Sequence, residues 1–83
     1  MFEGTRKFNI EEENAIEMKR TLSIVYNALR EKGYNPINQI VGYLLSEDPT
    51  YITNHMNARA IICKIDRDEL LQDMVRQYLN SGK

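Results

Sequence analysis

Few side chains in this 83-residue chain are suited to catalysis. His55 is the single histidine and Cys63 the single cysteine. No sequence neighbour of His55 forms a recognisable general-base arrangement with it. Cys63 would need a cationic neighbour, such as Lys64 or Arg67, to become a reactive thiolate, and a free cysteine is more often an inert, buried side chain. We therefore expect a protein that is not an enzyme.

Metal and cofactor sites are equally poorly supported. One histidine and one cysteine do not make a zinc site within a single chain. The four glycines are isolated, so there is no glycine-rich phosphate loop. The acidic runs at residues 11–13 and 66–69 have a sufficient local role as charges at helix starts. We expect no metal and no cofactor.

Modification by a protein kinase is the remaining chemistry, and it requires a hydroxyl group on flexible chain. Residues 1–10 show no helical or strand period, and we expect them to form a flexible tail. Thr5 is the only hydroxyl residue in this tail, and Arg6 and Lys7 follow it. A phosphate on Thr5 would add nearly two negative charges. A threonine in a flexible tail is more often not a phosphorylation site, so composition alone makes Thr5 only a candidate.

Residues 11–83 have the pattern of one all-α domain. Hydrophobic spacing predicts four main helices at about residues 11–32, 36–45, 54–65 and 67–80, and no strand. The net charge is −1 and 28% of the residues are charged. No apolar run approaches 18 residues and no signal peptide begins the chain, so the cytoplasm is the expected compartment.

The sharpest predicted boundary separates the first two helices. Gly33 suits the left-handed position that ends a helix, Asn35 can cap the next one, and Pro36 fits its first position. No charged residue occurs from position 34 to position 45. A charge-free helix in such a chain is expected to be central, with the other helices packed around it. Its apolar face is predicted to comprise Ile37, Ile40, Val41 and Leu44.

The last predicted helix has an apolar surface that is too broad for one partner. Its apolar residues spread over about half of the circumference, against roughly 100° for a one-sided surface helix. A domain of this size also has a marginal core, which a second copy would enlarge. We therefore expect a homodimer that uses this helix and the charge-free helix. The predicted interface residues are Ile40, Leu44, Leu71, Met74, Val75 and Tyr78.

A DNA-binding regulator is the alternative function. Residues 36–45 and 54–65 could form a helix-turn-helix, but the break between them exceeds the usual three or four residues. The second helix has only two cations, whereas specific DNA binders commonly neutralise several phosphates. We therefore favour the interpretation that the polar side chains of the helix at residues 54–65 form a face exposed to solvent. The residues that could contact DNA are Asn54, His55, Asn57, Arg59 and Lys64.

The chain resembles the IreB family of small regulatory phosphoproteins from Gram-positive bacteria. The resemblance is most specific in the run KGYNPINQIVGY at residues 32–43, and it continues through Ser46, Asp48-Pro49 and Tyr51. Later segments extend it over nearly the whole chain. These are Asn57-Ala58-Arg59, Arg67-Asp68-Glu69, Val75-Arg76 and Tyr78-Leu79.

This resemblance implies a compact helical homodimer with a disordered N-terminus and a core similar to helix-turn-helix folds. It also implies a non-enzymatic protein that is phosphorylated by a membrane-anchored Ser/Thr kinase with extracellular PASTA repeats. A cognate phosphatase reverses this phosphorylation. In the family this switch bears on cell-envelope stress and cephalosporin resistance. The family's phosphorylated threonine precedes a basic-Phe pair, and Thr5, followed by Arg6-Lys7-Phe8, matches that position. A second threonine found upstream in family tails is replaced here by Phe2.

Overall fold

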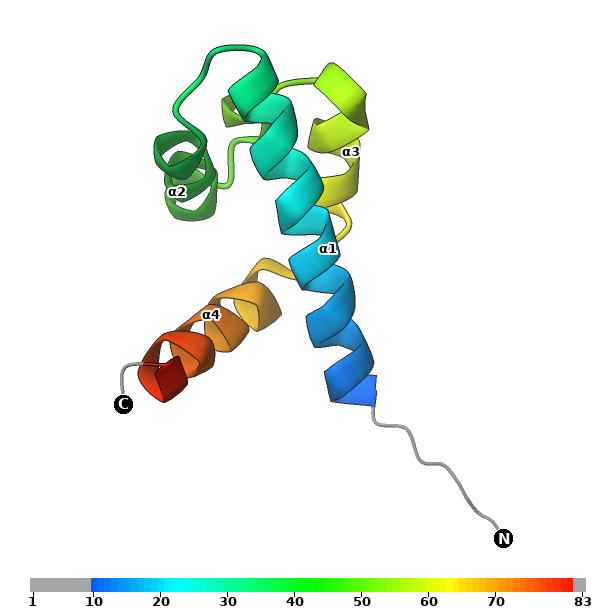
Figure 1. Cartoon of the computed structure of the whole chain (residues 1–83), viewed down its shortest axis with the longest axis vertical. Helices are drawn as coiled ribbons and strands as arrows, with labels where there is room; N and C mark the ends of the chain where they lie inside the picture. The colour runs from blue at the N-terminus through cyan, green and yellow to red at the C-terminus, as the bar shows by residue number, and fades with distance from the viewer. Residues whose placement is uncertain (1–9, 82–83) are drawn as a thin grey trace, which may run out of the picture.

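The structure, a computed structural model, describes residues 10–81, with side chains from residue 13 to residue 80. No strand occurs in this part of the chain, so the predicted all-α class is confirmed there. The predicted tail lies outside the described residues except for Ile10, which begins the first helix. In chain order the elements are α1 (Ile10–Glu31), α2 (Pro36–Ser46), the 3₁₀ turns η1 (Pro49–Tyr51) and η2 (His55–Asn57), α3 (Ala58–Cys63) and α4 (Arg67–Ser81) (Figure 1).

The central element is α1, and the prediction of a central charge-free helix was wrong. α2, η2, α3 and α4 all contact α1 (Figure 1). With 22 residues, α1 is about 33 Å long, which lets one helix support the other elements along its length. α2 packs chiefly against α1 and η1.

The core lies mainly where the C-terminal half of α1 meets α2 and α3. Val25, Ala28 and Leu29 of α1 are fully buried, and Ile52 enters from the connection between η1 and η2 with no exposed surface. α4 contributes Leu70 alone to the fully buried set. The buried apolar residues are Met18, Val25, Ala28, Leu29, Ile40, Tyr43, Leu44, Ile52, Ala58, Ile62 and Leu70.

The boundary between α1 and α2 follows the prediction. Gly33 has φ +86°, a left-handed conformation that disfavours a side chain. The Asn35 side chain accepts a hydrogen bond from the Asn38 N–H at 3.1 Å, and Pro36 occupies the first turn of α2. Each residue takes the backbone position for which its chemistry is suited.

The third predicted helix, residues 54–65, is only partly formed. Met56 and Asn57 have φ values of +56° and +62°, so the backbone leaves the helical path and α3 begins at Ala58. Asparagine tolerates this conformation better than most residues do. The Arg59 side chain donates to the Ile52 carbonyl at 2.8 Å and ties the start of α3 to the preceding connection. An apolar stripe at helical spacing does not reveal such a kink.

Candidate functional site

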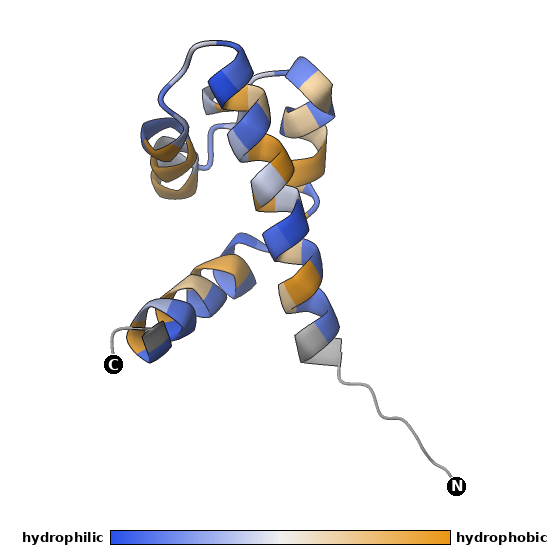
Figure 2. Cartoon of the chain, in the orientation of Figure 1, coloured by the Kyte–Doolittle hydropathy of each residue, from blue (hydrophilic) through white to orange (hydrophobic). Residues whose placement is uncertain are grey.

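α2 has an exposed apolar stripe beside its buried one. Ile40, Tyr43 and Leu44 are buried, but the apolar side chains that repeat at intervals of four residues next to them are not. Hydrophobic residues make up much of α2 (Figure 2). Ile37 and Val41 lie on one face with Ile40 and Leu44, as predicted, but no other helix covers them. The exposed residues are Ile37 (60% exposed), Val41 (45%) and Leu45 (82%).

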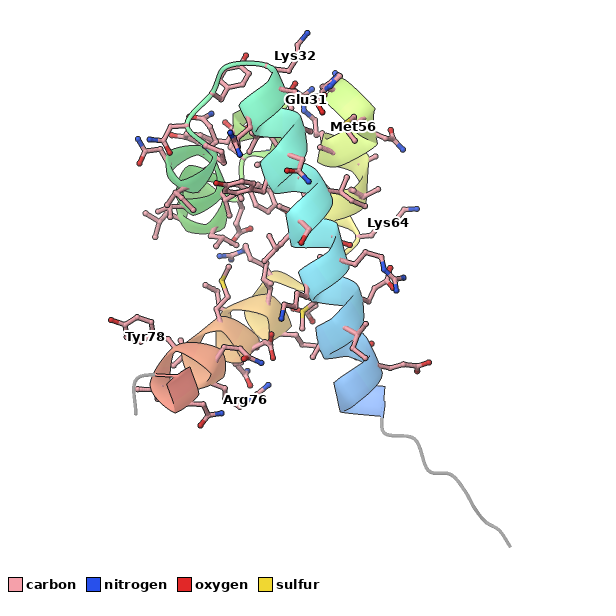
Figure 3. All side chains as sticks on the ribbon, viewed as in Figure 1. Glu31, Lys32, Met56, Lys64, Arg76 and Tyr78 are labelled. Carbon is pink, nitrogen blue, oxygen red and sulfur yellow. The ribbon has the colours of Figure 1, made fainter. Side chains whose placement is uncertain are left out.

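α4 also buries only part of its broad apolar surface. Leu70 is 2% exposed and Met74 packs partly against the core, whereas the remaining apolar side chains are exposed. Tyr78 and Arg76 project from opposite sides of α4 (Figure 3). The helix thus has one face toward α1, one apolar face and one polar face. The exposed apolar residues of α4 are Leu71, Val75, Tyr78 and Leu79.

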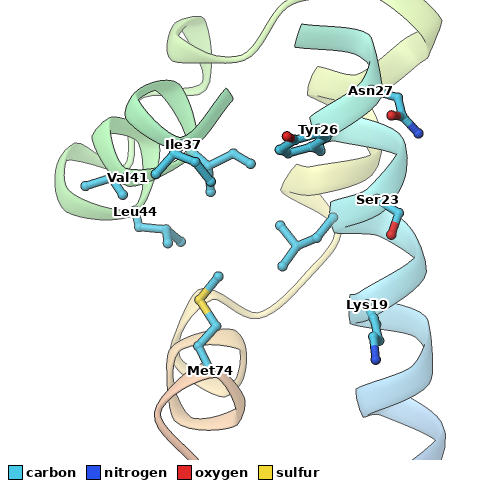
Figure 4. Close-up of a pocket in the computed structure, with 10 residues that line it drawn as sticks. Lys19, Ser23, Tyr26, Asn27, Ile37, Val41, Leu44 and Met74 are labelled. Carbon is cyan, nitrogen blue, oxygen red and sulfur yellow. The ribbon is translucent and has the colours of Figure 1, made fainter. Parts of the chain in front are cut away.

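A groove of about 480 Å³ lies between α1, α2 and α4 (Figure 4). Ile40, Leu44 and Met74 of the predicted interface line this groove together with Ile37 and Val41. Ile40 and Leu44 are only 7% exposed, so they form its floor and belong chiefly to the core of the chain.

The other predicted interface residues continue this surface along α4. Leu71 lies three residues before Met74, Val75 one residue after it and Tyr78 four residues after it. These side chains therefore lie on one face of the helix. Contiguous exposed apolar surface on two neighbouring elements is typical of an interaction site. We call this surface the apolar face, and it comprises Ile37, Val41, Leu45, Leu71, Met74, Val75 and Tyr78.

A polar junction fixes the start of α4 to the end of α2. Arg67 donates to the Leu44 carbonyl at 2.6 Å and pairs with Glu47. Burial raises the pKa of the adjacent Tyr43 hydroxyl, its hydrogen bond with the Cys63 thiol adds to the rise, and the Arg67 charge opposes it. The junction therefore sets how the two helices that form the apolar face lie relative to each other.

The surroundings of His55 and Cys63, the two residues considered for catalysis, differ from those expected. His55 does have a partner, because its Nε2 lies 2.7 Å from Glu31 Oε1 and links η2 to the end of α1. Cys63 is exposed, so the expectation of a buried thiol was wrong. Arg67, one of the two cations proposed for Cys63, is directed to Leu44 and Glu47.

The segment considered for DNA recognition is too short to present the predicted set of side chains. α3 has six residues. Arg59 is bonded to Ile52 and His55 is bonded to Glu31, so two of the five candidate contacts serve the chain's own packing.

Metal-binding clusters and membrane-spanning helices are missing from the part of the chain that the structure describes. Between residues 10 and 81, no group of three or more His, Cys, Asp or Glu side chains is arranged to hold a metal ion. None of the helices in that range combines the length and apolar character needed to cross a bilayer.

Comparison with known proteins gives the family. A family model described as "IreB regulatory phosphoprotein" matches residues 3–80. This chain belongs to the IreB family of regulatory phosphoproteins. A UPF0297 protein of Acetivibrio thermocellus is 61% identical over 75 residues, which cover 90% of this chain and 83% of that protein. A UPF0297 protein of Lachnoclostridium phytofermentans is 52% identical over 78 residues, which cover 94% of this chain and 89% of that protein.

Family membership confirms the resemblance seen in the sequence, and the regulatory class that it implies. The candidate phosphorylation site, Thr5, falls inside the matched residues 3–80 but outside the described part of the structure. Sequence reasoning missed that α2 leaves part of its apolar surface exposed. The available signal was Leu45, which lies beside the predicted apolar stripe and widens it beyond what one core contact can cover.

Proposed function

We propose that this chain is a cytoplasmic, non-enzymatic, homodimeric phosphoprotein whose switch is phosphorylation of Thr5. A membrane-anchored Ser/Thr kinase with PASTA repeats adds the phosphate, and a cognate phosphatase removes it. The switch acts in the response to cell-envelope stress and in cephalosporin resistance through a downstream protein partner. The observation that carries this proposal is the family match over residues 3–80, which includes Thr5 and the Arg6-Lys7-Phe8 that follows it.

The chemistry of the tail supports an electrostatic switch. Arg6 and Lys7 make the unmodified segment basic. A phosphothreonine carries about −1.5 to −2 charges at neutral pH, so it cancels or inverts the local charge. A partner surface that distinguishes the two charge states would then read the modification.

Phosphosite mapping in native cells tests the switch. Mass spectrometry is applied to the protein from cells grown with and without cell-wall stress. We expect phosphate on Thr5 at a level that changes with stress. The matched variants are Thr5→Ser, which keeps a phosphorylatable hydroxyl, and Thr5→Val, which does not. An unmodified Thr5 at full peptide coverage under both conditions would refute the proposal.

The apolar face supports the homodimer. A second copy would cover exposed apolar side chains on α2 and α4 that the chain itself leaves in water. The double variant Leu71→Asp/Val75→Asp is expected to dissociate the dimer in sedimentation equilibrium. Gln72→Asp/Arg76→Asp also introduces two aspartates, about a third of a turn around α4, and it changes the net charge by −3 instead of −2. It is nevertheless expected to leave the dimer intact, because it lies outside the apolar face. If both double variants sediment as dimers, the apolar face is not the interface.

A further inference from the structure

A second crevice separates the N-terminal half of α1 from α4, and it adjoins the apolar face, since Met74 and Tyr78 also line it. Its apolar part, about 640 Å³, includes Ile16, Met18 and Leu70. Its polar part, about 330 Å³, is lined by four carboxylates together with Arg76. Met18 and Asp73 line both parts, so the crevice is continuous. The four carboxylates belong to Asp66, Asp68, Glu69 and Asp73.

These carboxylates have no cationic partner among residues 13–80. The ion pairs in that range join other residues, such as Glu17 with Arg20 and Glu47 with Arg67. Asp66 is occupied as the cap of α4, since it accepts the Asp68 N–H at 2.9 Å. Asp68 accepts the Gln72 side-chain N–H at 3.1 Å through one carboxylate oxygen, and no ion pair in the described part of the chain involves Glu69 or Asp73. The three carboxylates therefore keep oxygens that a positively charged group can approach. The crevice therefore offers an apolar wall beside an acidic wall, with Ile16 57% exposed on the apolar side.

We propose that the unphosphorylated tail of the same chain, residues 1–9, occupies this crevice. Arg6 and Lys7 would lie against Asp68, Glu69 and Asp73. Phe8 would cover the apolar side chains at the α1 end. Thr5 phosphorylation would expel the tail, because its phosphate would meet these same carboxylates. This inference rests on the proposed function and specifies what the phosphate changes.

The length of the tail permits this arrangement. Met18 is eight residues into α1, which is about 12 Å from the start of the helix. Nine extended residues span about 30 Å, so a tail that folds back along α1 reaches the whole crevice. The charges are complementary, since Glu3 is the only acidic residue that opposes Arg6 and Lys7 in the tail.

Docking of the tail overlaps the apolar face only at Met74 and Tyr78, which also line the apolar part of the crevice. The acidic wall includes Glu69, Gln72 and Arg76, which lie about a third of a turn around α4 from Leu71 and Val75. A second copy centred on Leu71 and Val75 and basic tail residues on the acidic wall therefore use different parts of one helix.

Paramagnetic relaxation tests this proposal on the full chain. A nitroxide is attached to Glu3→Cys in a Cys63→Ser background, and amide signals are compared before and after reduction of the label. We expect signal loss at residues 66–76 that disappears in Arg6→Glu/Lys7→Glu and in Thr5→Glu. Arg6→Lys/Lys7→Arg and Thr5→Val preserve the charge of the tail and are expected to keep the loss. In about 1 M salt, where the screening length is about 3 Å, the loss should also diminish.

Three outcomes would overturn the proposal. The first is signal loss confined to the first turn of α1, whose residues 11–13 are the nearest glutamates in the sequence. The second is loss on α4 that persists in Arg6→Glu/Lys7→Glu. The third is loss that arises only between chains, when spin-labelled protein is mixed with isotope-labelled protein that has no nitroxide.

This test is separate from the test of the phosphorylation switch. Relaxation effects on α4 in a protein whose Thr5 is never phosphorylated in cells would support docking and refute the switch. A phosphorylated Thr5 without relaxation effects on α4 would refute docking and leave the switch to be read by a partner.

Discussion

Two regions of this molecule use similar apolar residues in different ways. In the first, formed by the C-terminal half of α1 with α2, η2 and α3, side chains such as Leu29, Ile52 and Ile62 are almost completely buried. In the second, formed by the N-terminal half of α1 with α4, Ile16, Val75 and Leu79 are each more than half exposed. We call these regions the head and the arm.

The difference shows where the chain's own folding free energy comes from. Buried apolar surface stabilises by roughly 25 cal/mol per Å², so the head contributes most of the stability of an isolated chain. The arm depends on Leu70, on part of Met74 and on the junction at Arg67. Apolar side chains that do not stabilise the isolated chain are the ones that remain for a partner.

The largest expected effect comes from a cavity in the head. Ile52→Ala removes a fully buried side chain from the connection between η1 and η2. We expect unfolding to become easier by about 2–5 kcal/mol, because both transfer free energy and packing are lost. Urea denaturation followed by circular dichroism measures this change. A loss below about 1 kcal/mol would mean that the head is not the main source of stability.

A matched pair in the arm tests whether α4 separates from the head. Leu70 is 2% exposed and its neighbour Leu71 is 37% exposed. Leu70→Ala is expected to cost about 2 kcal/mol and to accelerate amide hydrogen exchange mainly in α4, since local opening needs less energy there. Leu71→Ala should change the unfolding free energy of the monomer by about 0.5 kcal/mol at most. Equal acceleration of exchange in α2 and α4 would contradict the division into head and arm.

The sequence allowed the helices to be predicted where local chemistry decides their limits. Gly33, Asn35 and Pro36 each have one favoured backbone role, and the boundary between α1 and α2 is accordingly where it was expected. α4 begins at the predicted residue, Arg67, because Asp66 accepts the N–H groups of Asp68 and Glu69, in line with a helix-start role for residues 66–69. It ends one residue beyond the predicted position 80.

Features that depend on tertiary contacts could not be predicted. Met56 and Asn57 are left-handed in a segment whose apolar spacing remains helical, and the Arg59–Ile52 bond that accompanies the kink joins residues seven positions apart. The exposure of Ile37 and Val41 follows from the groove that α1, α2 and α4 leave open, which no local pattern specifies. The breadth of the apolar surface on α4, by contrast, correctly indicated more surface than one core could bury.

The junction between head and arm is expected to have an intermediate effect. Arg67→Met keeps the length of the side chain but removes its bonds to the Leu44 carbonyl and to Glu47. We expect a loss of about 1–3 kcal/mol, because a partly buried carbonyl is left without its donor. Thermal unfolding measures the loss, and Arg76→Met on the exposed side of the same helix is the control. If Arg67→Met behaves like Arg76→Met, the junction does not hold the arm.

The smallest expected effect is a pH dependence of the stability that comes from the Asp48 cap after α2, outside the arm. The Thr50 hydroxyl and N–H donate to Asp48 Oδ1 at 2.7 Å and 3.0 Å, and these bonds lower the pKa of the Asp48 carboxyl below its ordinary value of 3.8. The stabilisation from this cap is therefore present above pH 3.8 and is lost as the pH falls through the lower pKa of the folded state.

The difference in melting temperature between the natural protein and Asp48→Asn measures this contribution. We expect the difference to be constant near neutral pH and to shrink toward about pH 2, because the folded state then protonates Asp48 as well. Thr50→Val removes the hydroxyl bond, the larger cause of the lowered pKa, but keeps the backbone bond, so it should shift the loss toward the ordinary pKa. A difference that stays constant down to pH 2 would show that the carboxylate charge of Asp48 does not stabilise the turn that leads into the buried Ile52.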